Sequence, residues 1–352
     1  MVTKTVGPRL CCSDSYVFMF CFLPRCSETL GMGEPDAVLR SKRQMASTKN
    51  SDGADLRLQE ERYMPTIFTP YAGQMPARDK IVDIYTAGYL QATERHLRFA
   101  TGHLGLRLPP GASILDFGCG IGSSVRSLLA QGYNAFGVDV LEYWNRDFDK
   151  YWLIGDKPPA EIAERLKLVN PANYRLPFDD VTFDFCFSDQ VFEHIFDYKT
   201  TMSEIVRVLK PGGISLHNFP GPNNLMEGHV GLPFPWLCFS RSYLTLCAWI
   251  SVIRGTETDW RGRVRSNTEI MRFNNYPTKA KLRKIARSAG VEITFLEVDA
   301  FMFRGGGRAA PMLKWLRKIK LDRLAVQTAG LVLLQRYMLL KAPPTAQREV
   351  RG

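Results

Sequence analysis

The chain of 352 residues has few cysteines and no long uninterrupted apolar run. Eight cysteines are too few for a disulfide-stapled protein of this length, so we expect free thiols in a reducing compartment. The best candidate for a membrane span, residues 236–253, contains Arg241 and several Ser and Thr residues, and fits a helix that covers apolar surface better. Internal repeats at solenoid periods are also absent. These absences favour a globular protein.

The composition supplies a large core but distributes charge unevenly. Hydrophobic residues make up 45% of the chain, and the scattered charges argue against wholesale disorder. From Arg254 onward, 21 basic residues stand against 8 acidic ones. This excess suits an anionic partner such as lipid headgroups, a phosphorylated substrate or nucleic acid, and it equally suits a solvated basic face.

Four of the cysteines crowd the N-terminus around the short apolar run 16–23. The segment mimics a signal peptide, but the run is barely long enough and no small-residue cleavage site follows it. A zinc cluster is an alternative, although the spacing matches no familiar ligand pattern. We expect residues 1–60 to form a disordered extension and residues 61–110 a helical cap. The cysteines concerned are Cys11, Cys12, Cys21 and Cys26.

Strand patterns alternate with helical patterns from residue 113 onward. Strands are expected at 113–117, 134–140, 183–188, 214–219, 291–298 and 331–340, and helices at 123–131, 202–209 and 279–288. The alternation predicts an α/β fold with right-handed crossovers and a mostly parallel sheet covered by helices on both faces. We assign this domain to residues 111–345. Insertions are expected after the fifth and sixth strands, at 220–275 and 301–327.

The sharpest motif is ILDFGCGIG, in which a strand ends at closely spaced glycines just before a helix. Glycines without side chains let backbone N–H groups approach a ligand closely. Asp139 ends the next strand 21 residues after Gly118, where a carboxylate can accept both hydroxyl hydrogens of a ribose. A dinucleotide-binding loop would have glycine at position 123, which Ser123 occupies. A simple tight turn is the structural alternative.

Four segments together resemble the S-adenosylmethionine (SAM)-dependent methyltransferases with the Rossmann-like, seven-stranded fold. They are ILDFGCGIG at 114–122, GVDV at 137–140, LPFDDVTFDFCFSDQVFEHI at 176–195 and RVLKPGG at 207–213. The last two are similar to the small-molecule branch that includes quinone-biosynthesis methyltransferases. The resemblance covers about residues 80 to 341, and it implies a seven-stranded sheet and SAM as the cofactor.

The resemblance also implies roles for individual residues of the cofactor site. Asp116 and the loop residues would cradle the methionine part of SAM, Asp139 would bind the ribose, and Val140 or Leu141 would pack on the adenine. The loop residues are Gly118, Cys119, Gly120 and Gly122. Asp116 can alternatively cap a helix. Related sequences carry an acid four residues before the LPF segment, where this chain has Ala172, and Asn173 offers its amide oxygen to the adenine amine instead.

The acceptor side is expected just after the fourth strand. Ser188, Asp189 and Gln190 follow that strand at the carboxyl edge, where such sheets bind ligands. Gln190 and His194 stand four positions apart, and we expect them on one face of a helix that begins there. The resemblance places these positions against the methionine end of the cofactor or against the acceptor. His194 can deprotonate an acceptor hydroxyl, or it can be only a packing residue.

Both insertions carry features that bear on the acceptor. The aromatic segment GPNNLMEGHVGLPFPW within 220–275 predicts an acceptor lid, and His229 in it is either catalytic or a turn residue with no chemical part. The insertion 301–327 places an apolar face beside basic residues, which predicts a helix on an anionic membrane or an ordinary solvated helix. The basic residues are Lys314, Arg317, Lys318 and Lys320.

We therefore predict methyl transfer from SAM to a small-molecule, glycan or lipid-linked acceptor, at oxygen or carbon. His194, Gln190 and His229 are the catalytic candidates, and we expect no metal. The predicted location is cytoplasmic, with possible peripheral contact to a membrane. The alternative is a non-catalytic protein of the same fold that docks on membrane or RNA through its basic C-terminal segment. Nucleic-acid methylation is disfavoured, because SDQVF stands where base amino-methyltransferases need an Asp/Asn-Pro-Pro-aromatic segment.

Overall fold

The computed structural model describes residues 78–142, 144, 160–170 and 172–343. The chain divides into two compact units, residues 1–64 and 65–352, and all described residues belong to the second. The expected N-terminal extension over 1–60 and the cap residues up to 77 lie outside the described residues.

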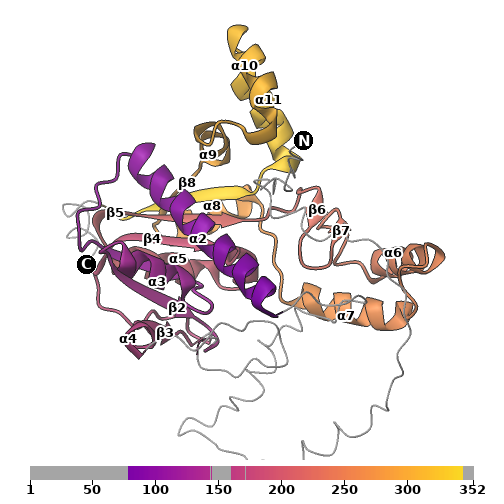
Figure 1. The fold of residues 1–352 in the computed structure, drawn as a ribbon, viewed down its shortest axis with the longest axis horizontal. Coiled ribbons are helices and arrows are strands. Elements are labelled where there is room, and N and C mark those ends of the chain that lie inside the picture. Colours follow the sequence, from indigo (N-terminus) through magenta and orange to yellow (C-terminus); the bar gives the residue numbers. More distant parts are fainter. Residues whose placement is uncertain (1–77, 143, 145–159, 171, 344–352) are drawn as a thin grey trace, which may run out of the picture. The chain divides into compact units, whose positions relative to one another are not determined.

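A seven-stranded sheet organises the second unit (Figure 1). Its strand order is β3-β2-β1-β4-β5-β9-β8, with β1 to β5 parallel to one another and β9 antiparallel to both β5 and β8. The strands are β1 (Ser113–Phe117), β2 (Asn134–Asp139), β3 (Leu166–Leu168), β4 (Phe183–Asp189), β5 (Leu209–Phe219), β8 (Glu292–Phe295) and β9 (Arg336–Lys341). The expected fold class is confirmed. Because the order reverses between β1 and β4, ligands are expected at the carboxyl ends of these strands.

Helices cover both faces of the sheet. One hydrophobic core joins α5 and α8 to strand residues such as Leu115 and Cys186, and another joins α2, α3 and α9 to Ile114 and Phe185. Neighbouring strand residues therefore point to opposite faces, as the two-residue strand period requires. The helices are α2 (Arg78–Gly102), α3 (Ser123–Ala130), α4 (Ala160–Ala163), α5 (Tyr198–Val208), α8 (Lys279–Ser288) and α9 (Glu297–Phe303).

The insertion after β5 has a core of its own. It contains the hairpin of β6 (Met226–Glu227) and β7 (Leu232–Pro233), followed by α6 (Arg241–Ile253) and α7 (Trp260–Arg272). Residues from the β6–β7 turn and from both helices pack together in this core. These elements lie beside one end of the sheet, at the right of Figure 1.

A second insertion separates the last two strands of the sheet. After β8 and α9 come η5 (Gly307–Ala309), α10 (Ala310–Lys318) and α11 (Asp322–Leu333), and the latter two extend away from the sheet at the top of Figure 1. Among the described helices, none combines the length and the apolar character needed to cross a membrane.

Three expected element bounds are wrong. Residues 331–333 end helix α11, and only from Arg336 does the chain form β9; an apolar run by itself does not distinguish helix from strand. The strand expected to reach residue 298 ends at Phe295, because Glu297 begins α9. The Lys-Pro-Gly-Gly segment 210–213, which the expected bounds left between a helix and a strand, is part of β5, and the register beside it shifts between Phe183 and Phe185.

Candidate active site

The glycine loop turns the chain sharply from β1 into α3. Gly118, Gly120 and Gly122 all have positive φ, at 85°, 53° and 82°. A Cβ atom at Gly118 would lie 2.2 Å from Cγ2 of Val191, and one at Gly122 would lie 2.7 Å from Cδ1 of Leu166. Glycine is therefore required at both positions by backbone conformation and by packing within the protein itself.

Asp139, at the end of β2, holds the glycine loop from the side. Its Oδ2 accepts a hydrogen bond from Gly120 N at 2.9 Å, and its Oδ1 accepts one from Val140 N at 2.7 Å. Burial raises the pKa of this carboxyl to about 6, although the backbone donors oppose the shift. A carboxylate has about four acceptor sites, and backbone groups of Gly120, Val140 and Leu141 use three, so Asp139 can hold the loop and still accept a ribose hydroxyl.

Asp116, in β1, offers an unused oxygen beside the same loop. Its side chain is buried, at 4% exposure, and Oδ2 has no hydrogen-bond partner. Burial, followed by the neighbouring Asp139 charge, raises its pKa to about 8. The capping role considered for Asp116 is not observed, because the N-cap of α3 is Gly122 with no side-chain cap bond. A buried carboxyl oxygen without a partner here suits the ammonium group of an amino-acid ligand.

The remaining cofactor candidates differ in how much of each side chain is free. Ser188 is fully buried, and its hydroxyl lies 2.7 Å from Nδ1 of His217, so this side chain is engaged inside the sheet. Cys119 is a buried free thiol. Asn173 is exposed, and its Oδ1 already accepts a hydrogen bond from Arg175 N at 3.0 Å. The adenine contacts of Asn173 and Val140 stay predictions.

Asp189 and Gln190 belong to a polar network at the ends of β4 and β5. Oδ1 of Asp189 accepts hydrogen bonds from Asn218 Nδ2 at 2.7 Å and from Gln190 Nε2 at 3.2 Å. Its Oδ2 lies 3.4 Å from Nη2 of Arg95. Both amide groups also donate to Gln335 Oε1, at 2.9 Å from Gln190 and 2.8 Å from Asn218. The network fixes Gln190 beside the strand ends.

The helix expected to begin at Gln190 is not formed. Gln190 has a φ of 58°, and the next element is the short 3₁₀ turn η4 (Phe192–His194). Gln190 and His194 therefore share no helical face, and the expectation that they do is wrong. Gln190 bonds to Asp189 and Gln335, whereas Nδ1 of His194 donates to the carbonyl oxygen of Phe273 at 3.0 Å.

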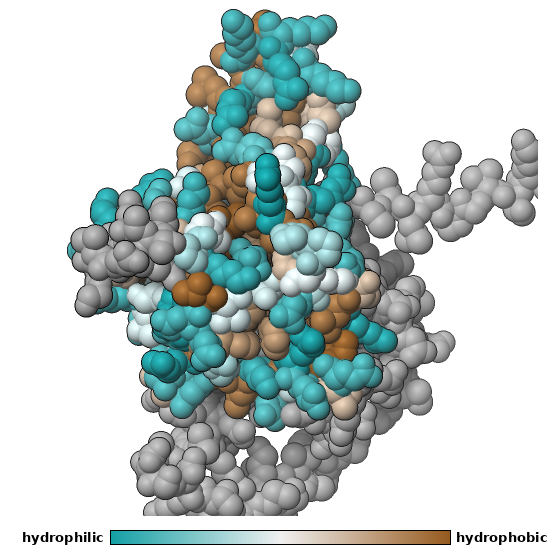
Figure 2. Space-filling view, turned by 90° about the vertical axis from the view of Figure 1, so that its left-hand side faces the viewer, coloured by the Kyte–Doolittle hydropathy of each residue, from teal (hydrophilic) through white to brown (hydrophobic). Residues whose placement is uncertain are grey.

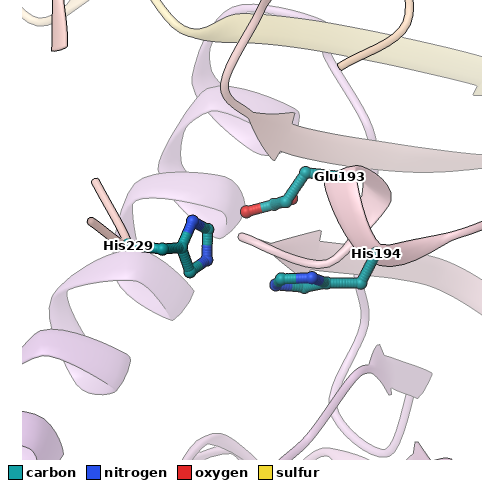
Figure 3. A group of neighbouring side chains, drawn as sticks. All are labelled: Glu193, His194 and His229. Carbon is teal, nitrogen blue, oxygen red and sulfur yellow. The ribbon is translucent and has the colours of Figure 1, made fainter. Parts of the chain in front are cut away.

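The two candidate catalytic histidines, which are 35 positions apart, do meet (Figure 3). The ring centroids of His194 and His229 are 5.1 Å apart, with the ring planes at 79°. Glu193 points toward both rings, and one potential ligand atom from each of the three residues lies within 4.8 Å of the others. Glu193 is fully buried, burial raises its pKa to about 8, and neither carboxyl oxygen has a hydrogen-bond partner.

The surroundings give the two histidines opposite pKa shifts. Burial, followed by the neighbouring His229, lowers the pKa of His194 to about 4, so its imidazole is neutral at working pH. Burial also opposes the charged form of His229, but Glu227 outweighs it and the pKa of His229 is raised. Nδ1 of His229 lies 2.8 Å from Oε1 of Glu227, and the hydroxyl of Tyr276 donates to the same carboxylate.

Several residues of this site were not predicted from the sequence. Glu193 stands directly before His194, and Glu227 two positions before His229, so both were open to notice as acids next to chosen histidines. Arg95, Gln335 and Tyr276 had no such signal, because they are distant in sequence from the motifs they contact.

Comparisons with known proteins find methyltransferases similar in sequence to part of this chain. Residues 115–216, from β1 into β5, match the family model described as a methyltransferase domain. A sterol 24-C-methyltransferase of Gibberella zeae is 30% identical over 131 residues, which are 37% of this chain and 33% of the relative. A demethylmenaquinone methyltransferase of Symbiobacterium thermophilum is 27% identical over 251 residues, or 68% of this chain and 88% of the relative.

Among solved structures, the phosphoethanolamine N-methyltransferase 2 of Haemonchus contortus in complex with SAM is 16% identical to this chain, with a TM-score of 0.37. The alignment covers 78% of this chain and 61% of that protein. The chain spans only about a third of the length of two fungal sterol 24-C-methyltransferases that it matches, 33% of the Gibberella zeae protein and 32% of the Schizosaccharomyces pombe protein.

The fold, the glycine loop and the matched segment place a methyltransferase domain of the Rossmann-like class at residues 115–216. The resemblance noted in the sequence is thereby confirmed. SAM is the cofactor of this class, and the residues present fit it: Asp116 for the ammonium group, the glycine loop for the amino-acid part, and Asp139 for the ribose.

Proposed function

We propose that the protein transfers the methyl group of SAM to an oxygen or carbon atom of a small-molecule, glycan or lipid-linked acceptor. The observation that carries this proposal is the pair Asp116 and Asp139, which flank the glycine loop at the strand reversal. The relatives are named for acceptors that are largely apolar, a sterol and demethylmenaquinone. Apolar acceptors of this kind fit the present chain best.

SAM, when bound, supplies a methyl group on an already activated sulfonium. The protein must align the acceptor, exclude water and, for a hydroxyl acceptor, remove its proton. His194 is placed for the last task. Its Nδ1–H is committed to the carbonyl of Phe273, so a neutral ring leaves the Nε2 lone pair free to take the hydroxyl proton.

The insertion after β5 supports the assignment of an acceptor lid. It contributes His229 and Glu227 to the site, and its exposed aromatic residues include Trp236, at 58% exposure, and Phe239. The ring of Phe239 lies 5.9 Å from that of Tyr276, which in turn contacts Glu227. An apolar surface connected to the two histidines suits a lipophilic acceptor.

The helices α10 and α11 support peripheral membrane contact, which we propose together with a cytoplasmic location. Their exposed apolar side chains are Met312, Trp315, Ile319, Leu321, Leu324, Leu331, Val332 and Leu333. Figure 2 shows apolar residues among hydrophilic ones along this extension. Arg317 is paired with Asp322, so Lys314, Lys318 and Lys320 are left to meet anionic headgroups. The described cysteines are free thiols, as in reducing compartments.

SAM binding tests the proposal most directly. Calorimetry is expected to show one site per chain, and Asp139→Ala is expected to weaken binding at least tenfold, because the ribose and the loop lose the same carboxylate. Asp179→Ala, which removes an exposed acid, is the matched control. A protein that binds no SAM at physiological cofactor concentration would instead be the non-catalytic docking protein.

The acceptor is then sought in cell extract. Extract incubated with enzyme and methyl-labelled SAM is searched by mass spectrometry for species that gain the label. Labelled lipid-soluble species are expected, and labelling confined to nucleic acid would contradict the proposed acceptor class.

A further inference from the structure

Glu193 is unusual among the buried polar groups of the site because nothing in the described protein satisfies it. Both of its oxygens are buried without a hydrogen-bond partner, while the side chain points toward His194 and His229 (Figure 3). Buried carboxyl groups are normally paired, and an unpaired one calls for an ion or another ligand. The Glu193 carboxyl therefore lacks a partner that an ion or a ligand would supply.

The two histidines are held in the tautomer that a metal requires. A carbonyl oxygen can only accept, so the contact with Phe273 O places the proton of neutral His194 on Nδ1. The Glu227 carboxylate does the same for His229. In the neutral form of each ring the Nε2 lone pair is consequently free, and a cation that binds His229 displaces any proton there. Histidine ligands commonly have their other nitrogen fixed by a carboxylate or a carbonyl in this way.

We propose that Glu193, His194 and His229 form a binding site for a divalent cation of the zinc type. The potential ligand atoms of these residues lie within 4.8 Å of one another. Small side-chain rotations would bring them to the bond lengths of about 2.0–2.2 Å that zinc requires. Two imidazoles and one carboxylate suit Zn²⁺ or a similar transition ion, and three protein ligands leave a coordination position open. The sequence-based expectation of no metal did not consider Glu193.

The place of the site suggests what the open position does. Glu193 and His194 follow β4 at the edge that carries Asp189, and His229 comes from the lid insertion. Resting on the proposed function, the cation would bind the acceptor oxygen and lower the pKa of its hydroxyl. His194 would then serve as a ligand, and the acceptor proton would pass to solvent rather than to this imidazole.

Cation binding is tested on the full chain after treatment with a chelator. Calorimetry with Zn²⁺ and absorption spectroscopy with Co²⁺ are expected to show one site in wild type that is lost in Glu193→Gln, His194→Ala and His229→Ala. Glu227→Gln, which removes the orienting carboxylate, is expected to weaken binding roughly 10- to 100-fold. His103→Ala is the matched control, because His103 is exposed and outside this group.

The sequence has four cysteines before residue 30, and their thiolates can also bind Zn²⁺ or Co²⁺. Repeating the titration after alkylation of accessible cysteines distinguishes that binding from binding at the proposed site. Thermal unfolding and SAM affinity show that each variant is folded. Unchanged Zn²⁺ and Co²⁺ binding in the three ligand variants, or no site in wild type after alkylation, would overturn the inference. SAM binding is measured separately, so failure of the cation site and failure of the proposed methyl transfer are distinguishable.

Discussion

Two carboxyl groups at or near the ends of the neighbouring strands β1 and β2 differ in charge state at neutral pH. Asp139 accepts hydrogen bonds from backbone N–H groups and has a pKa of about 6, so it is ionised. Asp116 has an unpaired oxygen and a pKa of about 8, so it is mostly protonated. The difference follows from hydrogen bonding to the charged form, which only Asp139 receives from the backbone. The free site therefore carries one negative charge rather than two.

This difference predicts proton release when SAM binds. The cationic ligand favours the carboxylate form of Asp116 and lowers its pKa, so SAM affinity should rise between pH 6.5 and 8 by at most about tenfold per unit. The rise should level off above the free-state pKa of about 8. Calorimetry at pH 7 in buffers of different ionisation enthalpy measures the released proton.

Asp116→Asn is the control for that experiment, because an amide cannot release the proton. An unchanged proton count in this variant would show that another group titrates, and the assignment of Asp116 to the ammonium group would be wrong.

Gly118 supports a prediction about stability. Gly118→Ala places a Cβ against Val191 in addition to the strain of positive φ. We expect a loss of roughly 2–5 kcal/mol, of which about 1–2 kcal/mol is conformational and the rest is the clash. Urea unfolding measures it. Gly111→Ala is the matched control, with a φ of 76° and nothing within 4 Å of its Cβ.

Val191→Ala in the Gly118→Ala background should recover part of the clash but none of the conformational loss. Equal stability of the Gly118→Ala and Gly111→Ala proteins would show that Val191 moves aside without cost.

At the scale of elements, local signals predicted β1, β2 and β4 well, missed the short strand β3, and predicted the later parts less well. The glycine loop and Asp139 lie within one strand–helix–strand unit, so their sequence spacing sets their contact. The turn η4 could not be foreseen, because the network of Asp189, Asn218 and Gln335 fixes Gln190 in a left-handed conformation. Because no α-helix forms there, the four-residue spacing of Gln190 and His194 does not place them on one face.

The helix α10 carries a prediction that belongs to this scale. Replacing Lys314, Lys318 and Lys320 by Glu should lower the affinity for anionic vesicles by roughly a hundredfold or more, since each basic residue contributes roughly 1 kcal/mol near such a surface. Vesicle sedimentation measures this affinity. Added salt should weaken wild-type binding in the same direction.

A matched variant changes Lys199, Lys284 and Arg287 on α5 and α8 to Glu, with the same change in net charge at other exposed positions. Equal binding by the two triple variants would mean that net charge, rather than α10, governs the association.

At the scale of the whole molecule, the sequence predicted which residues meet around the glycine loop, and only part of the group that surrounds the two histidines. The acceptor half is assembled from η4, the lid insertion, α2 and the start of β9. Contacts such as Arg95 with Asp189 join residues nearly a hundred positions apart, and no local periodicity reports them. His194 and His229 were chosen separately for their chemistry, and the fold of the insertion brings them together.

The position of β9 has a consequence for synthesis. The strand lies between β5 and β8, so β8 has no partner in the sheet until β9 is made. Gln335, just before β9, also completes the network around Asp189. A ribosome-bound chain that stops at residue 330 can pair β1 to β5, yet it still lacks one border of the sheet and one residue of the acceptor edge. Activity should therefore emerge only after translation has passed this strand, however early the nucleotide-binding half has folded.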